Sequence, residues 1–120
     1  MRTAELIDSL TETRDGGIDP VHHVTDRAKL AVLVTDMDEH GWVGPPLLVD
    51  GEQALTGAHR LVAARETFTP MPRVDIGELC DALGLKWAEL RHPDGDIDAN
   101  LDIAAEHLPT EIADYLGVQN

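Results

Sequence analysis

The chain has 120 residues, which fits one compact domain, and its formal net charge is −14. Hydrophobic residues make up 42% of the sequence but aromatic residues only 3%, so the core must consist mainly of aliphatic side chains. A net charge of this size repels a phosphate backbone. Nonspecific nucleic-acid binding is therefore excluded as the function, and we expect no DNA binding by this chain alone.

The single cysteine, Cys80, excludes a disulfide within the chain and a cysteine-based zinc site. No stretch is long and apolar enough to span a membrane, and the opening MRTAELIDSLTETRDGG lacks the apolar segment of a secretory signal. We therefore expect a cytoplasmic protein with no membrane partner.

Hydrophobic spacing divides the chain into short helices and strands. Apolar residues at helical spacing predict helices, and short runs bounded by proline or glycine predict strands. Thr3 can cap the first helix, Thr25 or Asp26 can cap the second, and Gly41 ends the second. The predicted helices cover residues 3–10, 27–40, 58–66, 77–85, 97–108 and 109–117, and the predicted strands lie in GIDPVHHV, PPLLVD, EQALTG and TPMPRVDI.

The order of these elements predicts the fold class. Strands alternate with helices over residues 18–77, with a hairpin around Gly51, and helices alone follow. We therefore expect an α/β (α+β) fold in one domain over residues 1–120, with a small mixed sheet. Residues 18–77 form its core, and residues 78–120 form an acidic helical extension with no Lys or Arg after Arg91.

The segment ALTGAHRLVAARE places a glycine, a histidine and an arginine at the start of a helix. Unpaired backbone N–H groups and the helix dipole favour an anion at such a start. Arg60 has the wrong sign for a first turn, which costs about 0.3–1 kcal/mol, and a bound phosphate would offset this cost. In the alternative interpretation Gly57 only makes a turn, His59 faces solvent, and Arg60 pairs with Glu52 or Asp50.

The residues around this segment resemble the ParB/sulfiredoxin superfamily from His22 to Ile76. The shared order is a helix entered through Asp and ended by Gly, a Pro-led apolar strand, a turn, and a short strand. A Gly-x-[His/Arg]-Arg box then opens a helix, and a Pro-led strand follows. Here the box is GAHR, at residues 57–60. The resemblance implies binding of a nucleoside triphosphate or diphosphate, and we expect Mg²⁺ to accompany it.

The resemblance also implies which residues form the site. In TDRAKL, Asp26 and Lys29 resemble the sulfiredoxin-type Asp-x-x-Lys, whose lysine helps to bind the nucleotide. His59 and Asp26 are the candidate catalytic groups. No metal site is expected at His22 and His23, because neighbours on a strand point to opposite faces. The implied phosphate-binding positions are Lys29, Thr56, Gly57, Ala58, His59 and Arg60.

Departures from the family pattern limit the function. Ala58 stands where sulfiredoxins carry their catalytic cysteine, so reduction of an oxidised peroxiredoxin is not expected. The nearest counterpart of the Glu-Asn-x-x-Arg box of partition proteins is ANLD at residues 99–102, which lacks both charged residues. The chain also lacks their basic helix-turn-helix. The box looks most similar to that of a relative that phosphorylates free serine.

Two functions of different classes remain, one with catalytic activity and one without. Whether the chain is an enzyme therefore stays open. The first is a standalone nucleotide-binding protein, with slow nucleotide hydrolysis or phosphoryl transfer to a small molecule as its activity. The second is a catalytically inactive regulatory or accessory protein. It would dock a basic protein partner through its acidic C-terminal helices, with Asp94, Asp96 and Asp98 as contact residues. A nuclease ranks last, because no carboxylate cluster for two metals is evident.

Overall fold

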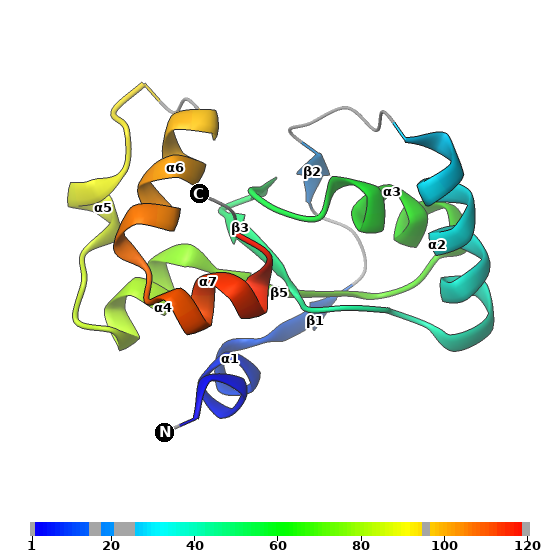
Figure 1. Ribbon diagram of the computed structural model, residues 1–120, viewed down its shortest axis with the longest axis horizontal. Coiled ribbons are helices and arrows are strands. Elements are labelled where there is room, and N and C mark those ends of the chain that lie inside the picture. Colours follow the sequence, from blue (N-terminus) through cyan, green and yellow to red (C-terminus); the bar gives the residue numbers. More distant parts are fainter. Residues whose placement is uncertain (1, 15–17, 21–25, 95–96, 119–120) are drawn as a thin grey trace.

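The computed structural model describes residues 2–14, 18–20, 26–94 and 97–118 (Figure 1). Its strands form one mixed sheet with the order β1-β5-β3-β4-β2, and helices surround it. The predicted α/β fold class, a small mixed sheet with helices and further helices toward the C-terminus, is confirmed. The strands are β1 (Glu12–Arg14), β2 (Asp19–Pro20), β3 (Leu47–Asp50), β4 (Gln53–Ala54) and β5 (Met71–Asp75).

The parallel pair of β3 and β5 forms the centre of the sheet. β1 lies antiparallel to β5 on one side. β4 lies antiparallel to β3 on the other side, which confirms the predicted hairpin, and β2 runs parallel to β4 at the far edge. The hairpin extends one residue beyond β4, because the backbone N–H of Leu55 donates to the carbonyl oxygen of Leu48 at 2.8 Å.

Helices cover both faces of the sheet, as Figure 1 shows, with α2 and α3 on one side and α4–α7 on the other. None of the helices in the described ranges has the length and apolar content needed to cross a bilayer. The helices are α1 (Thr3–Leu10), α2 (Arg27–His40), α3 (Ala58–Thr67), α4 (Ile76–Ala82), α5 (Trp87–Leu90), α6 (Ile97–His107) and α7 (Thr110–Leu116).

The central strand β3 is buried along its whole apolar length because both faces of the sheet are covered. Leu47 and Val49 belong to a hydrophobic cluster with α2 and α3. Leu48, between them, belongs to a second cluster with Ile7 of α1 and Leu116 of α7. A strand covered on both sides has a continuous apolar sequence instead of an alternating one, which explains the run LLV.

Some helix ends follow local signals and others follow tertiary contacts. Asp26 caps α2, since its carboxylate accepts a hydrogen bond from the backbone N–H of Lys29 at 2.9 Å, and Gly41 ends this helix with φ 80°. The prediction that Thr3 caps α1 is wrong. Its hydroxyl instead donates to the carboxylate of Glu111 in α7 at 3.2 Å, a contact between distant parts of the sequence.

Candidate functional site

The predicted phosphate box lies where the amino-terminal ends of α2 and α3 meet. The backbone N–H of Asp26, the N-cap residue of α2, donates to Nε2 of His59 in the first turn of α3, at 3.3 Å. A cavity of about 270 Å³ lies beside this contact. All the predicted phosphate-binding residues except Thr56 line it. The complete lining is Lys29, Leu33, Gly57, Ala58, His59, Arg60 and Gly117.

Gly57 holds a left-handed backbone conformation with φ 76° and ψ 36° at the start of α3. A Cβ atom at this position would lie 2.5 Å from Cδ2 of Leu47 and 3.0 Å from Nη2 of Arg60. Both distances are too short for ordinary contact, so no side chain fits here without displacing core atoms. The structure therefore gives a packing reason for the glycine, besides the close ligand approach that the sequence suggested.

Arg60 anchors the loop between α2 and β3 to the start of α3. Its Nη1 donates to the carbonyl oxygen of Pro45, and its guanidinium carbon lies 5.5 Å from the ring centroid of Trp42. Burial lowers the pKa of Arg60 from its ordinary value. Asp50, one of the carboxylates considered as its partner, instead pairs with Arg91 at 3.4 Å. These contacts are a structural reason for a cation in the first turn of α3.

The two candidate catalytic residues lie together, and the fold uses both. Asp26 caps α2 through its carboxylate. Nε2 of His59 accepts a hydrogen bond from the backbone N–H of Asp26, which requires the neutral imidazole with its proton on Nδ1. His59 therefore ties the starts of two helices together. A catalytic function for either residue stays a prediction.

Lys29 and Thr56 differ in whether their side chains already make hydrogen bonds within the protein. Lys29 is exposed and is one of the residues that line the cavity, and no hydrogen bond or ion pair within the described ranges engages its ammonium group. Thr56 is 9% exposed, and its hydroxyl oxygen accepts a hydrogen bond from the backbone N–H of Leu48 at 3.1 Å. Lys29 is therefore the cation most available to a ligand, whereas Thr56 stabilises the hairpin.

Two residues of the cavity wall were missed by the sequence analysis. Leu33 lies one helical turn after Lys29 and therefore shares its face, so helical spacing could have identified it. Gly117 ends α7, with φ 76°. Only the packing of the C-terminal helices brings it to the box, and no local signal in the sequence indicates this contact.

The described residues do not form a resident metal site. No group of three or more His, Cys, Asp or Glu side chains among them could hold a metal ion. The carboxylate assigned to the site, that of Asp26, is engaged in its helix cap. His22, His23, Asp96 and Thr25 lie outside the described residues.

Cys80 is a core residue and not a nucleophile. It is 2% exposed and lies in the same hydrophobic cluster as Leu48. Burial, with a smaller contribution from Asp81 and Asp75, raises the pKa of its thiol. Because the thiolate is the reactive form, Cys80 is unsuited to cysteine chemistry in the folded protein.

No protein-family model matches this chain, and no curated protein or solved structure shows significant similarity to it. The resemblance to the ParB/sulfiredoxin superfamily thus rests on the residues from His22 to Ile76 and stays a prediction. A proposal of function can also be based on the geometry around the cavity, which does not depend on this resemblance.

Proposed function

We propose that this protein binds a nucleotide through its phosphate groups, in the cavity between the starts of α2 and α3, and acts in the cytoplasm. The observation that carries the proposal is that Lys29, His59 and Arg60 line this one cavity, although the chain has only nine Lys and Arg residues and a net charge of −14. The start of α3, which has no side-chain cap, lies at the same place, and its dipole and N–H groups also favour an anion.

The size of the cavity suits the phosphates and leaves the nucleoside outside it. Pockets that enclose drug-sized ligands measure roughly 300–1,000 Å³, and this cavity measures about 270 Å³. The exposed ammonium group of Lys29 supplies a mobile point charge for a phosphate. The first turn of α3 supplies backbone N–H donors, and Arg60, held by Pro45, contributes its positive charge from a fixed position.

The activity that follows from such a site is slow hydrolysis of the nucleotide or phosphoryl transfer to a small molecule. Phosphoryl transfer depends mainly on positioning and charge neutralisation, which cations and helix starts supply. Mg²⁺ enters with the phosphates in this proposal, since Mg²⁺ is commonly held by substrate phosphates with one or two protein carboxylates. In this proposal His59, which lines the cavity, is the proton donor.

Calorimetric titration with ATP, CTP, GTP and ADP, each with Mg²⁺, tests the proposal. We expect binding of at least one of them, weakened about tenfold or more by Lys29→Ala, which corresponds to roughly 1.4 kcal/mol. Lys86→Ala removes the same charge from exposed Lys86, outside this cavity, and serves as the matched control. The absence of binding at millimolar nucleotide, or equal losses in both variants, would contradict the proposal.

Arg60→Ala is a poor test by itself. The substitution removes the contacts to Pro45 and Trp42, so it also loosens the loop before β3. A loss of nucleotide affinity in this variant could come from either effect. Lys29 avoids this ambiguity because only its backbone N–H contributes to the helix cap.

A second candidate function is the regulatory protein that docks a basic partner. It is favoured by the use of Asp26 and His59 inside the fold and by exposed carboxylates on α6 and α7. The double variant Glu106→Gln/Asp114→Asn should then abolish capture of one specific basic partner. The double variant Asp38→Asn/Glu39→Gln makes the same charge change on α2 and should retain capture; equal losses would indicate diffuse electrostatics.

A further inference from the structure

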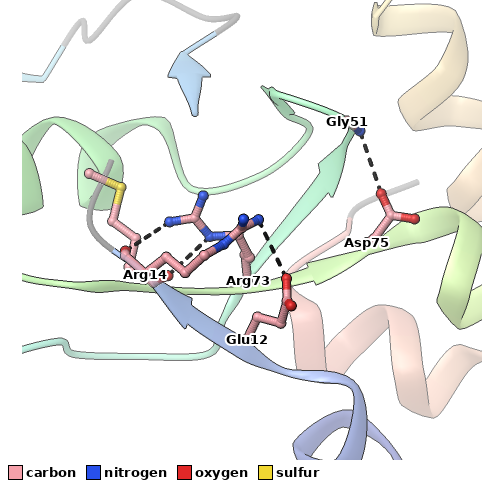
Figure 2. Close-up of polar contacts among 6 residues, drawn as sticks. Glu12, Arg14, Gly51, Arg73 and Asp75 are labelled. Carbon is pink, nitrogen blue, oxygen red and sulfur yellow. Dashed lines mark hydrogen bonds and ion pairs between the residues drawn. The ribbon is translucent and has the colours of Figure 1, made fainter. Parts of the chain in front are cut away.

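A larger cavity, of about 530 Å³, lies at the carboxyl ends of the parallel strands β3 and β5. Its wall includes Asp50, the last residue of β3, and Gly77 of α4, the helix that follows β5. The backbone N–H of Gly51 donates to the carboxylate of Asp75, the last residue of β5, at 3.5 Å, which ties the two strand ends together (Figure 2). Open α/β sheets bind ligands in crevices at the carboxyl ends of their strands, and the volume lies in the range of roughly 300–1,000 Å³ typical of small-ligand pockets.

The wall of this cavity contains a buried hydrogen-bond donor without an acceptor. Trp87 lines the cavity and is 6% exposed, and its Nε1 is fully buried with no partner among the described residues. The other tryptophan, Trp42, donates from Nε1 to the carbonyl oxygens of Gly44 and Pro45. A buried donor without an acceptor destabilises the folded protein. Trp87 therefore lacks an acceptor that a ligand bound in this cavity can supply.

Carboxylates from three elements also line the cavity, namely Asp50 of β3, Asp81 of α4 and Glu89 of α5. Asp50 is paired with Arg91, at 3.4 Å. Asp81 and Glu89 are exposed, and no hydrogen bond or ion pair within the described ranges engages their carboxylates. Lys86 is the other cation of the wall, so negative charge exceeds positive charge around the cavity. In a chain with a net charge of −14, this excess favours a ligand with a net positive charge.

We propose that this cavity binds the amino-terminal residue of a peptide, which presents an ammonium group next to a neutral carbonyl group. The ammonium group pairs with Asp81 and Glu89, and the carbonyl oxygen accepts the hydrogen bond from Nε1 of Trp87. The apolar part of the ligand packs on the indole ring. The ligand reaches the covered N–H through a small shift of α5, a single turn of four residues. A free amino acid fits less well, because its carboxylate adds negative charge beside Asp81 and Glu89.

Nuclear magnetic resonance of the ¹⁵N-labelled full chain tests this site through the indole Nε1–H signals of Trp87 and Trp42. The probe is L-phenylalaninamide, titrated at constant ionic strength and at about pH 6, where its amino group is charged. We expect a saturable downfield shift of the Trp87 signal, because a new hydrogen bond forms there. The Trp42 signal, identified by its loss in Trp42→Phe, should stay in place. The absence of a saturable shift at Trp87 overturns the proposal.

Three analogues of this probe show which of its groups the cavity recognises. Phenethylamine keeps the ammonium group and lacks the carbonyl group, whereas N-acetyl-L-phenylalaninamide keeps a carbonyl group and lacks the charge. L-Phenylalanine carries a carboxylate in place of the amide. We expect each analogue to bind about tenfold or more weakly than L-phenylalaninamide. Equal binding of any analogue overturns the proposal, because the ligand would then be a simple amine, a neutral amide or a free amino acid.

Charge variants separate a built site from diffuse attraction. The double variant Asp81→Asn/Glu89→Gln should weaken the binding of L-phenylalaninamide about tenfold. The double variant Glu78→Gln/Asp102→Asn makes the same charge change at exposed residues outside the cavity wall and should weaken it less than about twofold. Equal losses in the two variants overturn the proposal. All four substituted residues are exposed, so folding is retained. Lys29→Ala, which should weaken nucleotide binding, should leave the Trp87 response unchanged.

Discussion

Gly57 has a left-handed backbone conformation, and neighbouring atoms occupy the space that a side chain would need. With φ 76°, an alanine would be strained, and its Cβ would meet Leu47 and Arg60 at 2.5 and 3.0 Å. We expect Gly57→Ala to lower the free energy of unfolding by about 2–4 kcal/mol, from backbone strain and overpacking together. Urea denaturation followed by circular dichroism measures this loss.

The matched control is Gly51→Ala, in the turn between β3 and β4. Gly51 also has a positive φ, 64°, but a Cβ there would meet no atom within 4 Å. Only the backbone strain remains, and we expect a loss of about 1 kcal/mol. Equal losses at the two glycines would mean that contact with Leu47 and Arg60 does not determine the choice of glycine at the box.

The residues of the site were predictable where local chemistry identifies them. The box and the lysine of TDRAKL stood out from the sequence, and the structure brings Lys29 and His59 to one cavity. The partner of Arg60 was not predictable. It is a backbone carbonyl oxygen, that of Pro45, fifteen positions away in the sequence, and a backbone acceptor leaves no mark in the amino-acid pattern.

At the scale of elements, the C-terminal end of α3 is strained. Phe68 follows this helix with φ 54°, in the left-handed region, and its side chain is 92% exposed. The ring therefore buries little apolar surface. The left-handed backbone conformation of Phe68 destabilises the folded protein by about 1 kcal/mol or more. We expect Phe68→Gly to raise the free energy of unfolding by about 0.5–1 kcal/mol, after the larger entropy of glycine in the unfolded chain is subtracted.

Gly117 ends α7 in the same way and provides the opposite substitution. Its φ is 76°, and a Cβ there would meet no atom within 4 Å. We expect Gly117→Ala to lower the free energy of unfolding by about 1 kcal/mol. Thermal denaturation of Phe68→Gly and of Gly117→Ala measures the two changes in stability. A destabilised Phe68→Gly variant would show that the exposed ring has a stabilising contact in solution.

Elements with strong local patterns were predictable from the sequence, and those formed by distant pairing were not. The helix over residues 27–40 and the hairpin of β3 and β4 are confirmed. β1 was missed because its three residues, Glu12–Arg14, are all exposed and show no alternation. It exists because β5, some sixty positions later, offers an edge for pairing. α5, at Trp87–Leu90, was missed for a different reason: four residues are too few to show a helical pattern.

At the scale of the whole molecule, the acidic C-terminal helices share their core with the sheet. Leu116 of α7 is fully buried in one cluster with Leu48 of β3 and Val74 of β5. Removing its side chain leaves a cavity that touches the sheet as well as the helix. We expect Leu116→Ala to lower the free energy of unfolding by about 2–5 kcal/mol, with one cooperative transition.

Hydrogen exchange of backbone amides decides whether residues 18–77 are a separate unit. If the core is shared, Leu116→Ala reduces the protection of β3 and β5 by as much as that of α7, because all three open together. Tyr115→Ala, at a neighbouring position that is 37% exposed, should cost less than about 1 kcal/mol and serves as the control. Loss of protection in α6 and α7 alone would instead support the predicted boundary after residue 77. In that case the acidic helices could detach from the sheet while the box on α3 stays folded.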